Sequence, residues 1–256
     1  MTESNSKTTK QRQYLGETEL VDFNHPSIQA LIKQRGWLTQ DTYHQIEAVY
    51  NYVRDELLFG YNRDDAIPAS EVLRDGYGQC NTKGTLLVAL LRALKIPARI
   101  HGFTIDNNLQ KGAIPQYLFW LAPQKILHTW VDVWFEQRWV NLEGYIVDTQ
   151  YLTQIQRRFV KPLRNTLPRS RRTCDNAFSG FAIATPCLVA PQNQWLGDNT
   201  YIQREGIVDD FGTFDQPDDF YRHYGTNLIG LKRLAYRYVI RHLINRHVKH
   251  IRRHGL

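Results

Sequence analysis

The chain has 256 residues, of which 42% are hydrophobic and 22% are charged, and these globular values exclude wholesale disorder and a fibrous repeat. A chain of this length can build one large core and needs no disulfide or metal to stabilise it. The net charge of +7 comes from 32 Lys and Arg residues against 25 Asp and Glu residues, which is typical of proteins that bind nucleic acid or an anionic membrane.

No stretch of 18 apolar residues exists, so the sequence predicts no transmembrane helix. Residues 1–13 are polar, resemble a disordered tail and show no export signal, which predicts a cytoplasmic protein with reduced thiols. The three cysteines, Cys80, Cys174 and Cys187, are too few for a disulfide scaffold. We expect no zinc site and no cofactor, because no Cys-x-x-Cys motif occurs and no His pair stands near the cysteines at ligand spacing.

The N-terminal part predicts two helices. Asn24-His25-Pro26 begins a short one, and Thr39 or Asp41 caps a longer one whose apolar side chains repeat at helical spacing up to Leu57. A mostly polar loop follows over residues 60–70.

The central part predicts a buried helix followed by strands. A Gly-rich turn over residues 76–80 leads into residues 85–94, which are apolar on nearly all sides, and such a helix belongs in a core. Strands are expected over residues 99–105, 118–121, 129–135 and 138–142, with a hairpin turn at Gln137. Because helices precede strands, the order predicts an α+β fold.

The C-terminal part predicts a basic amphipathic helix. From Tyr221 onward a helical pattern returns, with an apolar stripe formed by Tyr236, Ile240, Leu243, Ile244, Val248 and Ile251. Such a helix can lie on an anionic membrane or contact a phosphate backbone. We favour the alternative that it docks on the domain, with its basic face solvated or paired with the acidic stretch between Asp209 and Asp219.

The basic residues are concentrated late in the chain. Residues 157–172 hold seven Lys or Arg, and residues 220–256 hold nine with no acid. Without these sixteen residues, half of the 32 basic residues remain, and the 25 acidic residues outnumber them. The basic character therefore belongs to two late segments, and we expect at most a weak membrane or nucleic-acid contact through the last helix.

Cys80 is the candidate nucleophile. It stands directly before the buried helix, where free backbone N–H groups and the helix dipole stabilise a thiolate and lower a cysteine pKa. Neighbouring glycines allow a substrate backbone to approach closely. The alternative is a structural thiol, because free cysteines are often buried.

His128 and Glu143 are the candidate partners of Cys80. His128 precedes the first strand of the expected hairpin and Glu143 follows the second, so both would lie near the same end of the sheet. A Cys–His–carboxylate relay could then form. Alone, His128 would be a surface or core histidine and Glu143 a solvated turn residue.

These motifs together resemble the transglutaminase-like superfamily of thiol enzymes. The resemblance covers roughly residues 40–150 and rests on Tyr77-Gly78-Gln79-Cys80, Leu94-Lys95-Ile96-Pro97-Ala98-Arg99, His128-Thr129-Trp130-Val131-Asp132-Val133 and Trp139-Val140-Asn141-Leu142-Glu143. It implies a helix-on-antiparallel-sheet core over residues 14–155 and leaves residues 156–256 as a C-terminal extension packed on that core.

The resemblance also implies roles for individual residues. Cys80 matches the nucleophile, His128 the general base, and Glu143 stands where the family usually has Asp, with Asp148 as a weaker substitute. Lys95 replaces a family glycine at the helix end. The Cys80 backbone N–H would serve the oxyanion hole, and Gln79, Tyr61 and Trp130 are candidates for the second donor.

The implied activity is acyl transfer from an amide, peptide or protein substrate through a Cys80 thioester. By analogy we favour a hydrolase, that is a protease, amidase or deamidase. The alternatives are an enzyme that transfers the acyl group of a protein glutamine to an amine, and a binding protein with an inactive transglutaminase-like fold that acts through its basic helix.

Overall fold

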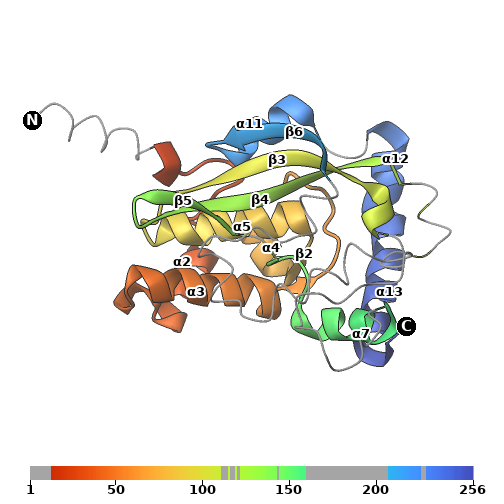
Figure 1. The fold of residues 1–256 in the computed structure, drawn as a ribbon, viewed down its shortest axis with the longest axis horizontal. Helices are drawn as coiled ribbons and strands as arrows, with labels where there is room; N and C mark the ends of the chain where they lie inside the picture. Colours follow the sequence, from red (N-terminus) through yellow and green to blue (C-terminus); the bar gives the residue numbers. More distant parts are fainter. Residues whose placement is uncertain are drawn as a thin grey trace, which may run out of the picture.

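The computed structural model describes residues 13–110, 115, 119, 122–142, 144–159, 207–225 and 229–255. Its elements form a four-stranded antiparallel sheet, a group of helices against one face of this sheet, and C-terminal helices along one side (Figure 1). The helices, including short 3-10 and π turns labelled η, are η1 (Gln13–Leu15), α2 (Pro26–Arg35), η2 (Trp37–Thr39), α3 (Thr42–Asn51), η3 (Tyr52–Glu56), α4 (Ala69–Asp75), α5 (Cys80–Ala93), η4 (Asn107–Gln110), α7 (Thr149–Phe159), α11 (Pro217–Tyr224), α12 (Gly230–Ala235), η6 (Tyr236–Ile240) and α13 (Arg241–His254). The strands are β1 (Leu58–Phe59), β2 (Tyr77–Gly78), β3 (Ala98–Asp106), β4 (Lys125–Phe135), β5 (Arg138–Leu142) and β6 (Ile207–Phe214).

The α+β prediction is confirmed by the sheet and the helices against it. The sheet has the order β5-β4-β3-β6, and each neighbouring pair is antiparallel. The hairpin between β4 and β5 turns at Glu136 and Gln137, which both have positive φ angles, as a tight two-residue turn requires. β6 lies in the predicted C-terminal extension, so that extension contributes an edge strand to the central sheet.

α5 is the central helix of the core. Every residue from Asn81 to Arg92 is buried, because α5 lies between the sheet and the helices α2, α3 and α4 (Figure 1). The sheet residues beneath it alternate along each strand, and Ile100 of β3 and Val131 of β4 face it as a register pair. This packing explains why the sequence of α5 is apolar on all sides.

The opposite face of the sheet carries a second apolar cluster formed by Phe103, Ile105, Ile126 and Trp130. These residues alternate with the ones that face α5, as the pleat of a strand requires. His128 belongs to this second face, because its ring stacks on Phe103 with centroids 4.8 Å apart.

Buried Arg92 joins distant segments near the end of α5. Its guanidinium donates to the carbonyl oxygen of Ala98 at 2.8 Å, to that of Gly16 at 2.7 Å and to Oε1 of Gln216 at 2.5 Å. A buried cation is tolerated when its N–H groups are all directed at acceptors in this way. The start of the described chain and the β6–α11 connection are thereby held to the core.

The C-terminal helices dock on the domain, as we favoured from the sequence. A separate apolar cluster joins α13 to α7 and β1 through Phe59, Val147, Tyr151, Leu152, Ile155, Ile244, Val248 and Ile251. Leu243 was predicted in the buried stripe, but it is 41% exposed. The one-residue offset between Leu243 and Ile244 turns Leu243 away from α7.

Of the two alternatives for the basic face of the last helix, the structure favours solvation, because Arg246, Lys249 and Arg253 are exposed and no ion pair joins the helix to Asp209–Asp219 within the described residues. Other arginines of this helix contact Asp64 and Asp148, whereas Asp209 and Asp210 pair with Lys125 and His101 across the sheet. Asp209 and Asp210 lie on the edge strand β6, whereas Asp218 and Asp219 lie on α11 and accept hydrogen bonds from Thr18 and Arg222.

Several local predictions can be compared with the structure. His25 caps α2 and Asp41 caps α3, as the sequence indicated. α4 and the short parallel pair β1–β2 were missed, and Gly76, the first residue of the predicted turn, ends α4 with a left-handed φ of 71°. The strand predicted over residues 118–121 is described only at Phe119, which is helical.

Other predictions fall outside the described residues. These include the tail over residues 1–12, Cys174, Cys187, and the basic segment from residue 160 onward. Within the part of the chain that is described, no helix is both long and apolar enough to cross a bilayer.

Candidate active site

Cys80 is the first residue of α5 and is partly buried. Gln79 precedes it as the N-cap, and Gln79 and Thr82 form a reciprocal capping box in which the Gln79 backbone N–H donates to Thr82 Oγ1 at 3.1 Å. The cap fixes the first turn, so the thiol stands where the free N–H groups of the helix gather.

The pKa of the Cys80 thiol is raised above its ordinary value. Burial is the main cause, and the nearby carboxylate of Asp65 adds to it, while the backbone N–H groups of Asn81, Cys80 and Thr129 act in the opposite direction. The expected lowering by the helix start is therefore present but is outweighed. In the resting protein the thiol is protonated at neutral pH and needs a base to become a nucleophile.

The beginning of α5 is hydrogen-bonded to β4 on either side of His128. Asn81 Nδ2 donates to the Leu127 carbonyl at 3.1 Å, and Thr129 Oγ1 donates to Asn81 Oδ1 at 3.3 Å. The pairing of β4 with β5 begins at Val131 of β4. At Leu127 and Thr129, which come before it, the start of α5 lies where a neighbouring strand would pair. The chain neighbours of Cys80 and of His128 thus meet at this edge of β4.

Tyr145 strengthens the same junction. Its hydroxyl is directed at the carbonyl oxygens of Cys80 (3.4 Å) and Thr129 (3.2 Å), and its side chain is fully buried. A Cβ atom at Gly84 would come within 2.8 Å of this hydroxyl, so a glycine at that position of α5 makes room for it. Tyr145 was not predicted as part of the site, although it stands two residues after Glu143.

His128 lies on the face of β4 that points away from α5, and its side chain is 5% exposed. Burial lowers its pKa to about 3, so the imidazole is neutral, and the same burial disfavours the charged imidazolium that forms when it takes up a proton. Its Nδ1 atom is buried and has no hydrogen-bond partner among the residues that the structure describes.

Glu143, the predicted carboxylate of the triad, lies outside the described residues. Asp148, the weaker substitute, is engaged elsewhere. It accepts hydrogen bonds from Arg252 Nη2 at 2.7 Å and from the backbone N–H groups of Phe59 and Tyr151, both at 2.9 Å. Its carboxylate therefore anchors α13 and the start of α7.

Two of the three candidates for a second oxyanion-hole donor are near Cys80. The Gln79 side-chain amide is already hydrogen-bonded, because its Nε2 donates to Asp65 at 2.9 Å and its Oε1 accepts from the Asn62 N–H at 2.9 Å. Burial and the neighbouring Cys80 and Asp65 side chains raise the pKa of Tyr61, which keeps its hydroxyl protonated. Trp130 lies on the far face of the sheet, where its Nε1 is buried with no partner in the described residues.

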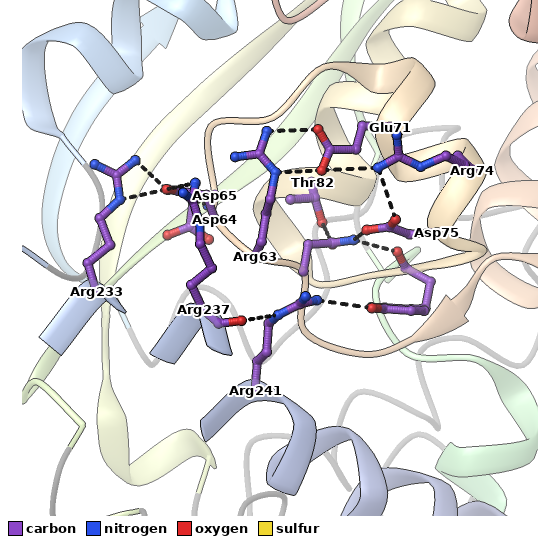
Figure 2. Close-up of polar contacts among 12 residues, drawn as sticks. Arg63, Asp64, Asp65, Glu71, Arg74, Asp75, Thr82, Arg233, Arg237 and Arg241 are labelled. Atoms are coloured by element: carbon purple, nitrogen blue, oxygen red, sulfur yellow. Dashed lines mark hydrogen bonds and ion pairs between the residues drawn. The ribbon is translucent and has the colours of Figure 1, made fainter. Parts of the chain in front are cut away.

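The acidic loop after Gly60 was also missed as part of the site. Asp65 is buried beside Gln79 and acts on the Cys80 thiol, although acidic residues in a polar loop are usually solvated. Oδ2 of its neighbour Asp64 accepts a hydrogen bond from Arg233 Nε at 2.7 Å and lies 3.8 Å from Arg237 Nη2. Figure 2 shows these arginines reaching from the C-terminal helix towards the loop. Within the described residues, no group of three or more His, Cys, Asp or Glu side chains is placed to hold a metal ion.

Residues 29–144 match the family model of the transglutaminase-like superfamily. The match runs from α2 to just past β5 and contains both Cys80 and His128. Residues 29–144 therefore form a transglutaminase-like domain.

A solved structure that resembles the chain is titled "The Crystal Structure of a Putative Cysteine Protease from Cytophaga hutchinsonii". The two chains are 16% identical, with a TM-score of 0.40, and the match covers 52% of this chain. It covers only 40% of that protein, so this chain corresponds to less than half of its length. No curated protein matches the chain.

Proposed function

We propose that the protein is a thiol enzyme that cleaves an amide or peptide bond through a thioester on Cys80. The observation that carries this proposal is the position of Cys80 at the start of α5, where the backbone N–H groups of Asn81, Cys80 and Thr129 act to lower the thiol pKa against the effect of burial. The membership of residues 29–144 in a superfamily that includes thiol enzymes supports the same chemistry.

In the proposed first step, Sγ of Cys80 attacks the carbonyl carbon of the amide. The thiol proton passes to His128, which is neutral at rest, and approach of the two side chains in the substrate complex has to offset the burial that lowers the imidazole pKa. The negative oxygen of the tetrahedral intermediate is stabilised by the N–H groups at the start of α5. His128 then returns the proton to the leaving nitrogen, so that the C–N bond breaks, an amine departs and a thioester remains.

In the second step, a water molecule gives one proton to His128 and its oxygen attacks the thioester. The C–S bond breaks, a carboxylic acid leaves, and the thiol of Cys80 recovers the proton from His128. Glu143 is proposed to hold the imidazole in the productive orientation, which follows from its place in the family motif. In the described structure the imidazole packs on Phe103, on the face of β4 that points away from α5, so the transfer requires it to turn towards the thiol.

The direct test measures amide hydrolysis by the full chain and by Cys80→Ala, using a library of peptides and simple amides. We expect the variant to lose turnover by at least about 1,000-fold, because the nucleophile is gone. Its melting temperature should stay close to that of the parent protein. A double variant with Cys174→Ser and Cys187→Ser is the matched control and should keep its activity.

The same assay tests the two partners. His128→Gln and Glu143→Gln should each lower kcat, and His128→Gln should have the larger effect. Activity that persists in Cys80→Ala would overturn the proposal. An added primary amine that appears in the product in place of water would make the protein an acyltransferase to amines, with the same thioester intermediate.

A further inference from the structure

The C-terminal helices carry an unusual concentration of exposed apolar side chains. The described part of the chain has nine large apolar side chains that are exposed, and six of them lie between residues 229 and 243. These six are Ile229 (81% exposed), Leu231 (83%), Leu234 (51%), Tyr238 (67%), Val239 (56%) and Leu243 (41%). Exposed apolar residues scattered singly are normal, but a contiguous group marks an interaction surface.

The group forms one outward face of the α12–η6–α13 helix. Leu231, Leu234 and Tyr238 follow each other at spacings of three and four residues, so they lie in one row. The same spacing continues this row through exposed residues that are all basic or histidine, namely His242, Arg246, Lys249 and Arg253. The row is therefore apolar in its first half and basic in its second half.

The opposite row of this helix is already used. Its first half directs Arg233 and Arg237 to Asp64, and Arg241 to the hydroxyl of Tyr77 at 3.3 Å (Figure 2). Its second half is buried against α7 through Ile244, Val248 and Ile251. The outward row is thus a separate surface of a helix that is held firmly in place.

The charge of this surface has one sign. The sequence contains no Asp or Glu from Phe220 to the end of the chain. Arg246, Lys249 and Arg253, together with Lys232, are exposed and form no ion pair with any described residue. A second copy docked face to face would bring two basic rows together, which is unfavourable. A phosphate backbone alone would leave the apolar half of the row in water.

We propose that this face docks on an anionic lipid bilayer. Leu231, Leu234 and Tyr238 would enter the boundary between headgroups and acyl chains, while Arg246 and Lys249 would contact lipid phosphates. The helix would lie in the plane of the membrane surface and would place the thiol site beside it. The proposal does not depend on the reaction that Cys80 performs.

The test measures sedimentation of the full chain with vesicles of phosphatidylcholine that contain about one third phosphatidylglycerol, and with vesicles of phosphatidylcholine alone. We expect binding to the anionic vesicles that weakens as the salt concentration rises. The variant Leu231→Ser with Leu234→Ser, and the variant Arg246→Glu with Lys249→Glu, should each bind at least about tenfold more weakly.

Matched controls come from the other end of the molecule. Leu38→Ser removes a side chain that is 64% exposed, and Lys33→Glu reverses an exposed charge on α2, so both should leave binding unchanged. All substituted residues are exposed, and their melting curves should show that the variants remain folded. Cys80→Ala should bind the vesicles as well as the parent protein, which separates this proposal from the proposed activity.

Three outcomes would overturn the proposal. Equal affinity for neutral and anionic vesicles would remove the role of the basic half. Absence of vesicle binding, together with a dimer that Leu231→Ser with Leu234→Ser abolishes, would assign the face to a second copy. Absence of vesicle binding, together with duplex RNA or DNA binding that the serine substitutions leave intact, would assign the basic half to nucleic acid.

Discussion

Two junctions in this molecule hold distant segments together, and they use different chemistry. At the start of α5, neutral groups of Asn81, Thr129 and Tyr145 form buried hydrogen bonds. Along α13, charged side chains form ion pairs, with Arg252 bound to Asp148 and Arg233 bound to Asp64. The first junction fixes atoms around the thiol without adding net charge there, whereas the second holds a whole helix against the domain.

The difference matters because charge acts over a longer range than a hydrogen bond. Asp65, a carboxylate near Cys80, already contributes to raising the thiol pKa. Among the causes of the raised thiol pKa there is no charged group of α13. The following experiments are designed to separate the two kinds of junction.

The largest effect is expected at the charged junction. Arg252→Met should lower the free energy of unfolding by about 3–5 kcal/mol, because it leaves the buried carboxylate of Asp148 without its partner. Chemical denaturation at neutral pH measures this loss. Arg253→Met is the control, since Arg253 is exposed and forms no ion pair with a described residue. Equal losses in the two variants would contradict the anchoring role of Arg252.

The pH dependence of Arg252→Met sharpens this result. Burial raises the pKa of Asp148. Its hydrogen bonds and the charge of Arg252 outweigh this effect and bring the pKa below its ordinary value. A carboxylate with a lowered pKa in the folded state stabilises the protein above the unfolded-state pKa, and this stabilisation is lost as the pH falls through the folded-state pKa. The difference between parent and variant should therefore shrink in acid.

The second prediction concerns Lys83, one turn after Cys80 on α5. This side chain is fully buried, its Nζ lies 2.8 Å from the Ile146 carbonyl and 3.1 Å from the Arg54 carbonyl, and burial lowers its pKa to about 7. Because the unfolded chain holds this proton up to a higher pH, the stability should rise with pH above 7. The gain by pH 9.5 should be about 3 kcal/mol at most.

Lys83→Met should lack this part of the gain, because it removes the titrating group and keeps a side chain of similar length. The measurement is urea denaturation of both proteins at the two pH values. A parallel rise in parent and variant would show that other groups cause it and that Lys83 keeps an ordinary pKa.

A smaller effect is expected at the neutral junction. Tyr145→Phe removes the hydroxyl that is directed at the carbonyl oxygens of Cys80 and Thr129, and should cost about 1–2 kcal/mol of stability. It should also change the rate at which iodoacetamide alkylates Cys80. Tyr151→Phe is the control, since the Tyr151 hydroxyl is buried with no partner among the described residues. If Tyr151→Phe costs as much as Tyr145→Phe, the role assigned to the Tyr145 hydroxyl is wrong.

The sequence predicted the parts of this structure that depend on local pattern. The helix of Cys80, the hairpin around Gln137 and the α+β class follow from periodicity and turn chemistry, and the transglutaminase-like domain follows from four ordered motifs. The partners of α13 were not predictable, because Asp64 and Asp148 are 169 and 104 residues away from the arginines they bind. Such pairings depend on the packing of the whole chain.

The same reasoning explains what was missed at the candidate site. The pKa of Cys80 was expected to fall from its place at a helix start, but burial and Asp65 are properties of the tertiary structure. Neither can be read from the residues around Cys80. The triad of Cys80, His128 and Glu143 remains a prediction, carried by the family motifs.

The smallest effect is expected at Lys95, where local pattern and backbone geometry disagree. Lys95 follows α5 with a φ of 63°, in the left-handed region that glycine adopts most easily, and the resembling family has glycine there. Lys95→Gly should therefore raise the stability by about 1 kcal/mol, since it relieves the strain of a side chain in that conformation. Lys33→Gly, inside α2, is the control and should instead lower the stability by about 1 kcal/mol. A loss of stability in Lys95→Gly would mean that contacts of the lysine side chain, such as its approach to the Phe23 ring at 5.9 Å, outweigh the backbone strain.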